Sequence, residues 1–306
     1  MGIRLWPFRR INRTSSKAEI VVAALTDVGR VRTGNEDSYS TLWGEKSPPG
    51  VDALIVVADG MGGHAAGEVA SSMAVDRVVE LMSSAVGSPH AGGQKYLEVL
   101  GRVLQDVNDT VYQASQDDDK RGMGTTCTVG VIKEDQLYVS HVGDSRAYLL
   151  RAGELHQITE DHSWVEHQVA IGALSREDAR NHPDRNVITR AIGLDPQVKV
   201  DGYLVSLANG DVLLLCSDGL TTMVEDTEIA SILSGNGPEE ACKALIDAAN
   251  REGGHDNITV AIAAVTGGPE DAPPITRPTD VAKTEEITLA ASALKRFSKS
   301  VLRLGR

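Results

Sequence analysis

Three aspartates in this chain stand where an apolar run meets a glycine-bearing turn. They are Asp59 after the run 54–58, Asp218 after the run 212–217, and Asp256 just before the run 258–265. The runs are short and mostly aliphatic, and therefore predict buried strands. One such aspartate is most often an ordinary turn residue, but three of them indicate a shared role.

The role that best fits carboxylates at strand ends is the binding of a hard cation. An ionised carboxylate at the end of a buried strand is unfavourable unless a positive charge lies beside it. Strands of one sheet can bring their ends together, and the three carboxylates would then repel one another without a divalent cation. Because glycines follow Asp59, backbone can approach a ligand closely. We therefore expect Asp59 and the carbonyl of Gly60 to bind metal through oxygen.

Further residues are candidates to complete this site. Arg32 precedes the acidic pair Glu36 and Asp37. Its planar guanidinium group is the side chain best matched to a phosphate, and a loop salt bridge is the alternative interpretation. Glu36 and Asp37 are candidate oxygen ligands, chiefly through water, because a small divalent ion keeps much of its hydration. Asp144, at a fourth strand junction, is a candidate for a weaker and more hydrated ion.

Several other routes to phosphate chemistry are absent from the sequence. There is no G-x-x-x-x-G-K-[ST] loop, no G-x-S-x-G elbow, and no arginine six residues after Cys216, where Thr222 stands. Carboxylates, glycines and an arginine without a protein nucleophile indicate water activated by metal. Two ions about 3.5–4 Å apart can lower the pKa of a shared water and bind a phosphate. Asp59 is the natural bridging ligand.

Composition excludes some classes of protein. No apolar run in the 306 residues is long enough to span a membrane, and the N-terminus lacks the apolar stretch of a secretory signal. The three cysteines form no C-x-x-C pair, which favours a reducing cytoplasm over a disulfide scaffold or a zinc site. The net charge is −13 although both ends are basic. The body of the chain is therefore strongly acidic, which argues against nucleic-acid binding.

The pattern along the chain predicts a domain between two basic tails. We expect a basic arm at 1–17, a single domain at 18–266, a Pro/Gly linker at 267–283 and a basic amphipathic helix at 284–306. The arm is either a solvated tail or a contact for a membrane surface or partner. The helix packs back on the domain, binds a partner or lies on an acidic membrane. We expect a monomer in the cytoplasm, with the tails as candidates for peripheral membrane contact.

Within the domain, helical and strand-like segments are readable. Apolar spacing predicts amphipathic helices at 67–81, 96–114 and 237–249, with strands elsewhere. Residues 160–195 interrupt the strands with a mixed segment, which is typical of a lid or substrate-recognition flap; we call it the flap segment. Its histidines, including His162 and His167, have a spacing that suits structural or surface roles better than a shared metal site.

Six short motifs, in order, resemble the bacterial form of the metal-dependent Ser/Thr protein phosphatases, the PPM or type 2C family. The motifs lie at 32–37, 57–64, 122–126, 141–146, 216–220 and 254–259. Each would be weak alone, but together they cover residues 20–266 and are specific.

The resemblance implies an α+β fold, a sandwich of two antiparallel β-sheets flanked by helices on both sides (four layers, αββα). It also implies two core Mn²⁺ or Mg²⁺ ions and direct hydrolysis of phosphoserine and phosphothreonine. By motif position it makes Asp59, Asp218 and Asp256 ligands of one ion. The other ion takes Asp59, the Gly60 carbonyl and Glu36 or Asp37, directly or through water. The remaining positions implied are Arg32 for phosphate and Asp144, with Asn186 from the flap segment, for a third ion.

The proton donor is less well defined by the resemblance. Human-type members have a histidine directly after the Asp-Gly pair, where this chain has Met61. His64, three residues on, is one candidate general acid, and water at a third ion is the other.

A bacterial member usually opposes a Ser/Thr kinase, so phosphorylated proteins and such a kinase are the implied partners. Two alternatives remain at this point. One is a non-catalytic phosphoprotein-binding scaffold of the same fold, which would have no need of the core carboxylates. The other is a phosphatase dedicated to one regulatory phosphoprotein, such as an anti-sigma antagonist.

Overall fold

In the computed structural model, the apolar run that ends in Asp59 is a strand, β3 (Ala53–Met61), with both faces covered. Its residues 54, 56 and 58 pack against helices, and residues 53, 55 and 57 pack against the opposite sheet of the sandwich. Side chains of a strand alternate between faces, so a strand covered on both sides is apolar throughout.

The structure describes residues 18–62, 65–84, 94–273 and 275. The expected basic arm at 1–17, the expected helix at 284–306 and most of the expected linker lie outside these residues, as does His64. Within the described part, the helices expected at 67–81, 96–114 and 237–249 are all present, each slightly longer.

Two antiparallel sheets form the centre of the molecule. The first has the strand order β1-β11-β10-β7-β8 and the second the order β2-β3-β5-β6-β9, with β4 paired to β3. The strands of the first sheet are β1 (Glu19–Asp27), β7 (Arg146–Arg151), β8 (Glu154–Gln157), β10 (Val212–Cys216) and β11 (Ile258–Thr266). Those of the second are β2 (Asp37–Trp43), β3, β4 (Gly124–Thr125), β5 (Cys127–Lys133), β6 (Gln136–Val142) and β9 (Asp201–Ser206).

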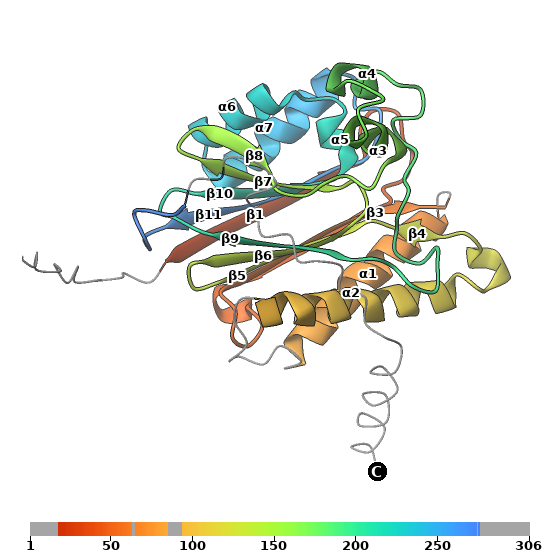
Figure 1. Ribbon diagram of the computed structural model, residues 1–306, viewed down its shortest axis with the longest axis horizontal. Helices are drawn as coiled ribbons and strands as arrows, with labels where there is room; N and C mark the ends of the chain where they lie inside the picture. Colours follow the sequence, from red (N-terminus) through yellow and green to blue (C-terminus); the bar gives the residue numbers. More distant parts are fainter. Residues whose placement is uncertain (1–17, 63–64, 85–93, 274, 276–306) are drawn as a thin grey trace, which may run out of the picture.

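Helices cover the outer face of each sheet (Figure 1). The long helices α1 (Ala65–Ser83) and α2 (Gln94–Ala114) cover the second sheet, and α5 (Asp218–Thr221), α6 (Asp226–Gly235) and α7 (Pro238–Arg251) cover the first. Two 3₁₀ turns, at Gly44–Lys46 and Asp118–Lys120, lie in loops. The flap segment contains α3 (Trp164–Ala170) and α4 (Arg176–Arg180), near α5 at one end of the sandwich in Figure 1.

Three hydrophobic cores fill the spaces between the layers. One lies between α1, α2 and the second sheet, one between the two sheets, and one between the first sheet and α5–α7. The expected αββα sandwich is therefore confirmed. Just before β9, Val198 and Val200 pack into the core under α2.

After β11 the chain stays against the domain for several residues. Asn209 donates its backbone N–H to the Pro269 carbonyl at 2.8 Å, and Arg151 donates to the Pro273 carbonyl at 2.6 Å. Ile275 is 8 % exposed and packs into the core between the sheets. Among the described residues, no helix is both long and apolar enough to cross a membrane.

Candidate metal centre

The first pair of acidic residues is brought together by strand pairing within the second sheet. In the antiparallel ladder of β2 and β3, Asp37 is the direct partner of Asp59. The Gly60 N–H also donates to the Glu36 carbonyl at 3.1 Å. The register of these two strands therefore places Asp37 and Asp59 side by side, although neither β2 nor its pairing was evident in the sequence.

The second pair comes from the first sheet. Asp218 starts α5 directly after β10, and Asp256 lies just before β11, which pairs with β10. Gly219 makes the approach possible, because a Cβ atom there would lie 1.9 Å from the Asn257 carbonyl oxygen. No side chain larger than hydrogen fits at this contact.

The two pairs meet across the sandwich. The Ser217 hydroxyl, beside Asp218, donates to Asp37 Oδ2 at 2.7 Å, and a hydrogen bond with Asp59 acts on Asp218. The expectation that the strands of one sheet would gather the aspartates was wrong, because Asp59 belongs to one sheet and Asp218 to the other. The carboxylates converge because the strand ends of both sheets meet at one end of the sandwich.

Asp144 approaches the same end from the turn after β6. Gly143, with φ of +117°, lies so close to Thr126 that a Cβ atom on it would be 2.5 Å from the threonine side chain. Thr126 accepts the Asp59 N–H at 2.8 Å, and its hydroxyl is 2.7 Å from that of Ser145. Thr126 thus links the turn that carries Asp144 to the end of β3.

Burial and the repulsion of neighbouring carboxylates raise the pKa values of Asp37, Asp59, Asp144 and Asp218. Burial, with the charges of Asp218 and Asp256, raises the pKa of Asp37 to about 7. Burial, with the charge of Asp256, raises the pKa of Asp218 to about 6, although a hydrogen bond with Asp59 opposes the shift. The pKa values of Asp59 and Asp144 are also raised well above the usual value, first by burial and then by neighbouring aspartates. A like charge nearby disfavours the ionised form, so the five carboxyls share one electrostatic neighbourhood.

Two of these groups have oxygen atoms without a protein partner. Oδ1 of Asp37 and Oδ1 of Asp144 are buried and accept no hydrogen bond. In the part of the chain that the structure describes, no three His, Cys, Asp or Glu side chains are already arranged around a single metal position. Buried carboxylates with unpaired oxygens and raised pKa values fit hard divalent cations. The assignment of each ligand stays a prediction.

Arg32 lies at the mouth of this cluster. Its Nη2 donates to Asp256 Oδ2 at 2.7 Å, and its side chain is 49 % exposed. The loop that carries it is held by Asn257, whose side chain donates to the carbonyls of Val28 and Gly34. The guanidinium group is therefore fixed beside the carboxylates and still open to solvent.

The structure places the remaining candidate residues differently. The Glu36 carboxylate lies at the start of α1, where a Cβ atom on Gly67 would be 2.0 Å from its Oε2. Burial opposes the charge of Arg32, but the bond to Asp256 and then the charge of Glu36 raise the pKa of its guanidinium group. Asn186 is exposed and lines the same cavity as Asp144 and Asp218. His64 lies outside the described residues.

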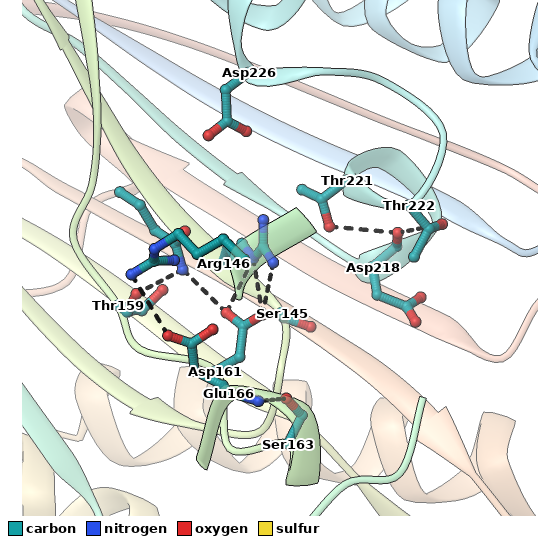
Figure 2. A network of polar contacts seen from close by, with 12 residues as sticks. Ser145, Arg146, Thr159, Asp161, Ser163, Glu166, Asp218, Thr221, Thr222 and Asp226 are labelled. Carbon is teal, nitrogen blue, oxygen red and sulfur yellow. Dashed lines mark hydrogen bonds and ion pairs between the residues drawn. The ribbon is translucent and has the colours of Figure 1, made fainter. Parts of the chain in front are cut away.

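A cavity of about 600 Å³ opens beside the carboxylates. The flap segment forms one wall, and the start of α5 with the α5–α6 turn forms the other. Arg146 and Asp161 form a 2.7 Å ion pair on its lining, and Figure 2 shows this pair near Asp218, Thr221 and Thr222 of the α5 region. The cavity is large enough for part of a peptide next to a phosphate.

Three residues that hold the site were not singled out from the sequence. Asn257 organises the Arg32 loop, Thr126 joins β3 to the Asp144 turn, and Ser217 bonds Asp37. Each lies inside one of the six motifs. The signal was therefore present, but their roles depend on partners between 19 and 229 positions away in the chain.

A pH dependence of stability follows from the raised pKa values. A carboxyl group whose pKa is higher in the folded chain stabilises the fold at low pH, and this contribution is lost as the pH rises through the folded value. Without divalent ions, the free energy of unfolding is expected to fall as the pH rises from about 4 to 7, the window set by Asp37 and Asp218. Urea unfolding in EDTA at several pH values measures this.

The Asp37→Asn variant is the control for that experiment. It removes the group with the pKa of about 7. The free energy of unfolding in EDTA should therefore depend less on pH between pH 6 and about 7. A free energy of unfolding that increases over this range in EDTA would contradict the expectation.

Comparison with known proteins agrees with this geometry. The family model described as "Protein phosphatase 2C" matches residues 30–257. A serine/threonine phosphatase of Listeria monocytogenes, stp, is 42 % identical over 239 residues, which are 77 % of this chain and 92 % of that protein.

Solved structures give the same result. The serine/threonine phosphatase Stp1 from Staphylococcus aureus has a TM-score of 0.74 and 36 % identity, over 81 % of this chain and 96 % of that one. The catalytic domain of the serine/threonine protein phosphatase PstP, in complex with two manganese ions, has a TM-score of 0.68 and 35 % identity, over 81 % and 99 %. The chain therefore belongs to the protein phosphatase 2C family and is a serine/threonine protein phosphatase of the metal-dependent (PPM) type.

Proposed function

We propose that this phosphatase holds two core Mn²⁺ or Mg²⁺ ions at the end of the sandwich. Asp59, Asp218 and Asp256 would hold one ion. Asp59, the Gly60 carbonyl and Asp37 would hold the other, with Glu36 acting through water. The observation that carries this proposal is the convergence of carboxyl groups from both sheets on one buried spot, where they raise one another's pKa.

Asp144 and Asn186 are proposed to hold a third, more weakly bound ion. Both line the cavity beside the core carboxylates, and Asp144 has a buried oxygen without a hydrogen bond. Asp144 approaches from the β6 turn and Asn186 from the flap segment, so this ion would join the metal centre to the flap segment. The exposure of Asn186 suits an ion that exchanges readily with solvent.

The residues of the chain would act on the phosphorylated side chain as follows. When bound, the ions would supply Lewis acidity that lowers the pKa of water and neutralises phosphate charge. Arg32 would orient the phosphate through its planar fork of donors, from its place beside Asp256. The peptide on either side of the phosphorylated residue would occupy the cavity under the flap segment. His64 and solvent held near Asp144 are the two candidates for delivering a proton to the leaving hydroxyl.

Phosphorylated proteins are the substrates of this family, and we infer that the physiological counterpart is a Ser/Thr kinase whose phosphorylations are reversed. The proposed location is the cytoplasm, since the three cysteines are all buried and unpaired and a reducing compartment suits such cysteines. The proposed form is a monomer. Contact with a membrane or partner protein is assigned to the two basic tails, because the domain between them is acidic.

Substitution of Arg32 tests the phosphate-binding role. Arg32→Lys keeps the charge but loses the planar fork, so kcat/KM for a phosphothreonine peptide with Mn²⁺ is expected to fall about 10-fold or more. Steady-state kinetics with p-nitrophenyl phosphate and the peptide measure it.

The matched control is Arg102→Lys, an exposed position on α2. It should leave both substrates unchanged. If Arg32→Lys retains full kcat/KM while Mn²⁺ still activates the enzyme, Arg32 does not bind the phosphate.

A further inference from the structure

His162 is a buried histidine at the beginning of the flap segment, and it bonds to three separate parts of the chain. It is 6 % exposed. Its backbone N–H donates to the Gly143 carbonyl at 2.7 Å, and its Nδ1 accepts the Gly143 N–H at 2.9 Å. Its carbonyl accepts the Thr189 N–H at 2.7 Å. One residue thus connects the turn before Asp144 to both ends of the flap segment.

These contacts fix the tautomer of the imidazole ring. Because Nδ1 accepts the Gly143 N–H, the proton of the neutral ring is on Nε2. Nε2 then donates to Asp201 Oδ2, 3.3 Å away. Arg190 Nη1 lies 2.9 Å from Nε2 but also 3.0 Å from Asp201 Oδ1, so Arg190 and His162 both donate to Asp201. Burial lowers the pKa of His162, which keeps Nδ1 free to accept.

The ring is also packed from the side. The rings of His162 and His141 have centroids 4.8 Å apart, and His141 is itself fully buried on β6, opposite Asp201 of β9. His162 therefore has little freedom to change its orientation. The bond to Gly143 is set by neighbours on β6, on β9 and in the flap segment.

Gly143 is also connected to the metal centre, through Thr126. Gly143 lies against Thr126, which accepts the Asp59 N–H. The turn that carries Asp144 is therefore enclosed between Thr126, next to Asp59, and His162, next to the flap segment. A shift of either neighbour has to be transmitted to Asp144, because close-packed interiors do not deform locally.

We propose that His162 is a positioning residue for the phosphatase reaction, which sets the flap segment and the Asp144 turn in a single arrangement through its Nδ1 bond to the Gly143 N–H. Residues of the flap segment and Asp144 line the same cavity. His162 therefore couples the flap segment, which would meet the peptide, to the turn that carries Asp144. Its contribution to turnover rests on the proposed function, whereas its effect on the flap segment does not.

Two substitutions distinguish the hydrogen bond made at Nδ1 from the one made at Nε2. His162→Asn places an oxygen near the position of Nδ1 and keeps an acceptor for the Gly143 N–H. His162→Gln places its amide nearer the position of Nε2 and leaves that N–H without a partner. His156→Gln, on β8, is the matched control for a histidine away from the Gly143 turn.

Limited trypsin digestion with Mn²⁺ present reports on the flap segment without measuring activity. The flap segment offers Arg176, Arg180 and Arg185 as exposed cleavage sites. An unpartnered buried N–H is destabilising, so the Gln variant is expected to be cleaved there about 10-fold faster than the parent. The Asn variant and the control should be cleaved at nearly the parental rate.

Kinetics provide the second measurement. The kcat/KM for a phosphothreonine peptide is expected to fall about 10-fold in the Gln variant and to be largely restored in the Asn variant. If the parent itself lacks Mn²⁺-dependent turnover, the proposed function fails, and the digestion still decides whether His162 holds the flap segment.

The ¹⁵N shifts of the imidazole in the unsubstituted protein provide a third measurement, which does not depend on folding of any variant. They should show Nδ1 unprotonated and Nε2 protonated at neutral pH. An Nδ1-protonated ring, or equal cleavage of the Asn and Gln variants after matching for thermal stability, would overturn the proposal.

Discussion

The Asp218→Asn variant is expected to lose at least about 100-fold in Mn²⁺-dependent phosphatase rate, because the substitution removes an anionic ligand of the metal centre. Asparagine has nearly the same shape, so the fold should be kept. Asp218 links the two pairs of acids: it begins α5 beside Asp256 and shares a hydrogen bond with Asp59 of the other sheet. Steady-state kinetics with a phosphothreonine peptide at several Mn²⁺ concentrations measure the loss.

The same substitution should have the opposite effect on stability without metal. Burial and the charge of Asp256 raise the pKa of Asp218 to about 6, so its ionised form is unfavourable at neutral pH. Removing that charge is therefore expected to increase the free energy of unfolding in EDTA above pH 6. If the substitution affected metal binding alone, the free energy of unfolding in EDTA would not change.

Asp247→Asn is the matched control. It makes the same change of charge at an exposed position of α7, and should leave rate and stability nearly unchanged. If Asp218→Asn keeps its rate within about twofold of the parent, the proposed ligand set is wrong, since loss of a core ligand costs far more.

The Gly219→Ala variant tests whether close backbone packing brings the two acids of the first sheet together. The added methyl group would lie 1.9 Å from the Asn257 carbonyl oxygen, so α5 and the Asp256 loop must move apart. A displacement of about 1 Å in a catalytic site can lower the rate about 100-fold. We also expect a loss of about 1–3 kcal/mol in the free energy of unfolding from overpacking.

Gly235→Ala is the control for this change. Gly235 ends α6, and a Cβ atom there would meet nothing within 4 Å. It should keep full activity and be neutral or slightly stabilising. Calorimetric Mn²⁺ titration of both variants shows whether the Gly219→Ala loss comes from metal affinity, as the displacement of Asp218 from Asp256 requires.

Local patterns in the sequence were sufficient for much of the fold. The helices α1, α2 and α7 and the strands β3, β10 and β11 could be predicted because apolar spacing reports directly which faces are buried. β2 could not, because residues 37–43 are largely polar and its place at a sheet edge leaves them partly exposed. β2 matters because it pairs Asp37 with Asp59, and this pairing depends on the register between the two strands.

The candidate site divides in the same way. The order of residues along the chain was enough to identify the groups available for chemistry. They are Asp59, Asp218 and Asp256 at strand junctions and Arg32 before an acidic pair, and the six motifs are specific enough to indicate the family. Each of these features is contained in a short stretch of consecutive residues, so it can be recognised without knowledge of the fold.

The place where those residues meet could be seen only in the folded chain. It showed that the aspartates come from two sheets, that Gly219 permits the approach of Asp218 to Asp256, and that His162 ties the flap segment to the Asp144 turn. The hydrogen bonds behind these findings join residues from 19 to 180 positions apart. They depend on strand register and on the packing of two layers, and neither is encoded in the spacing of any single segment.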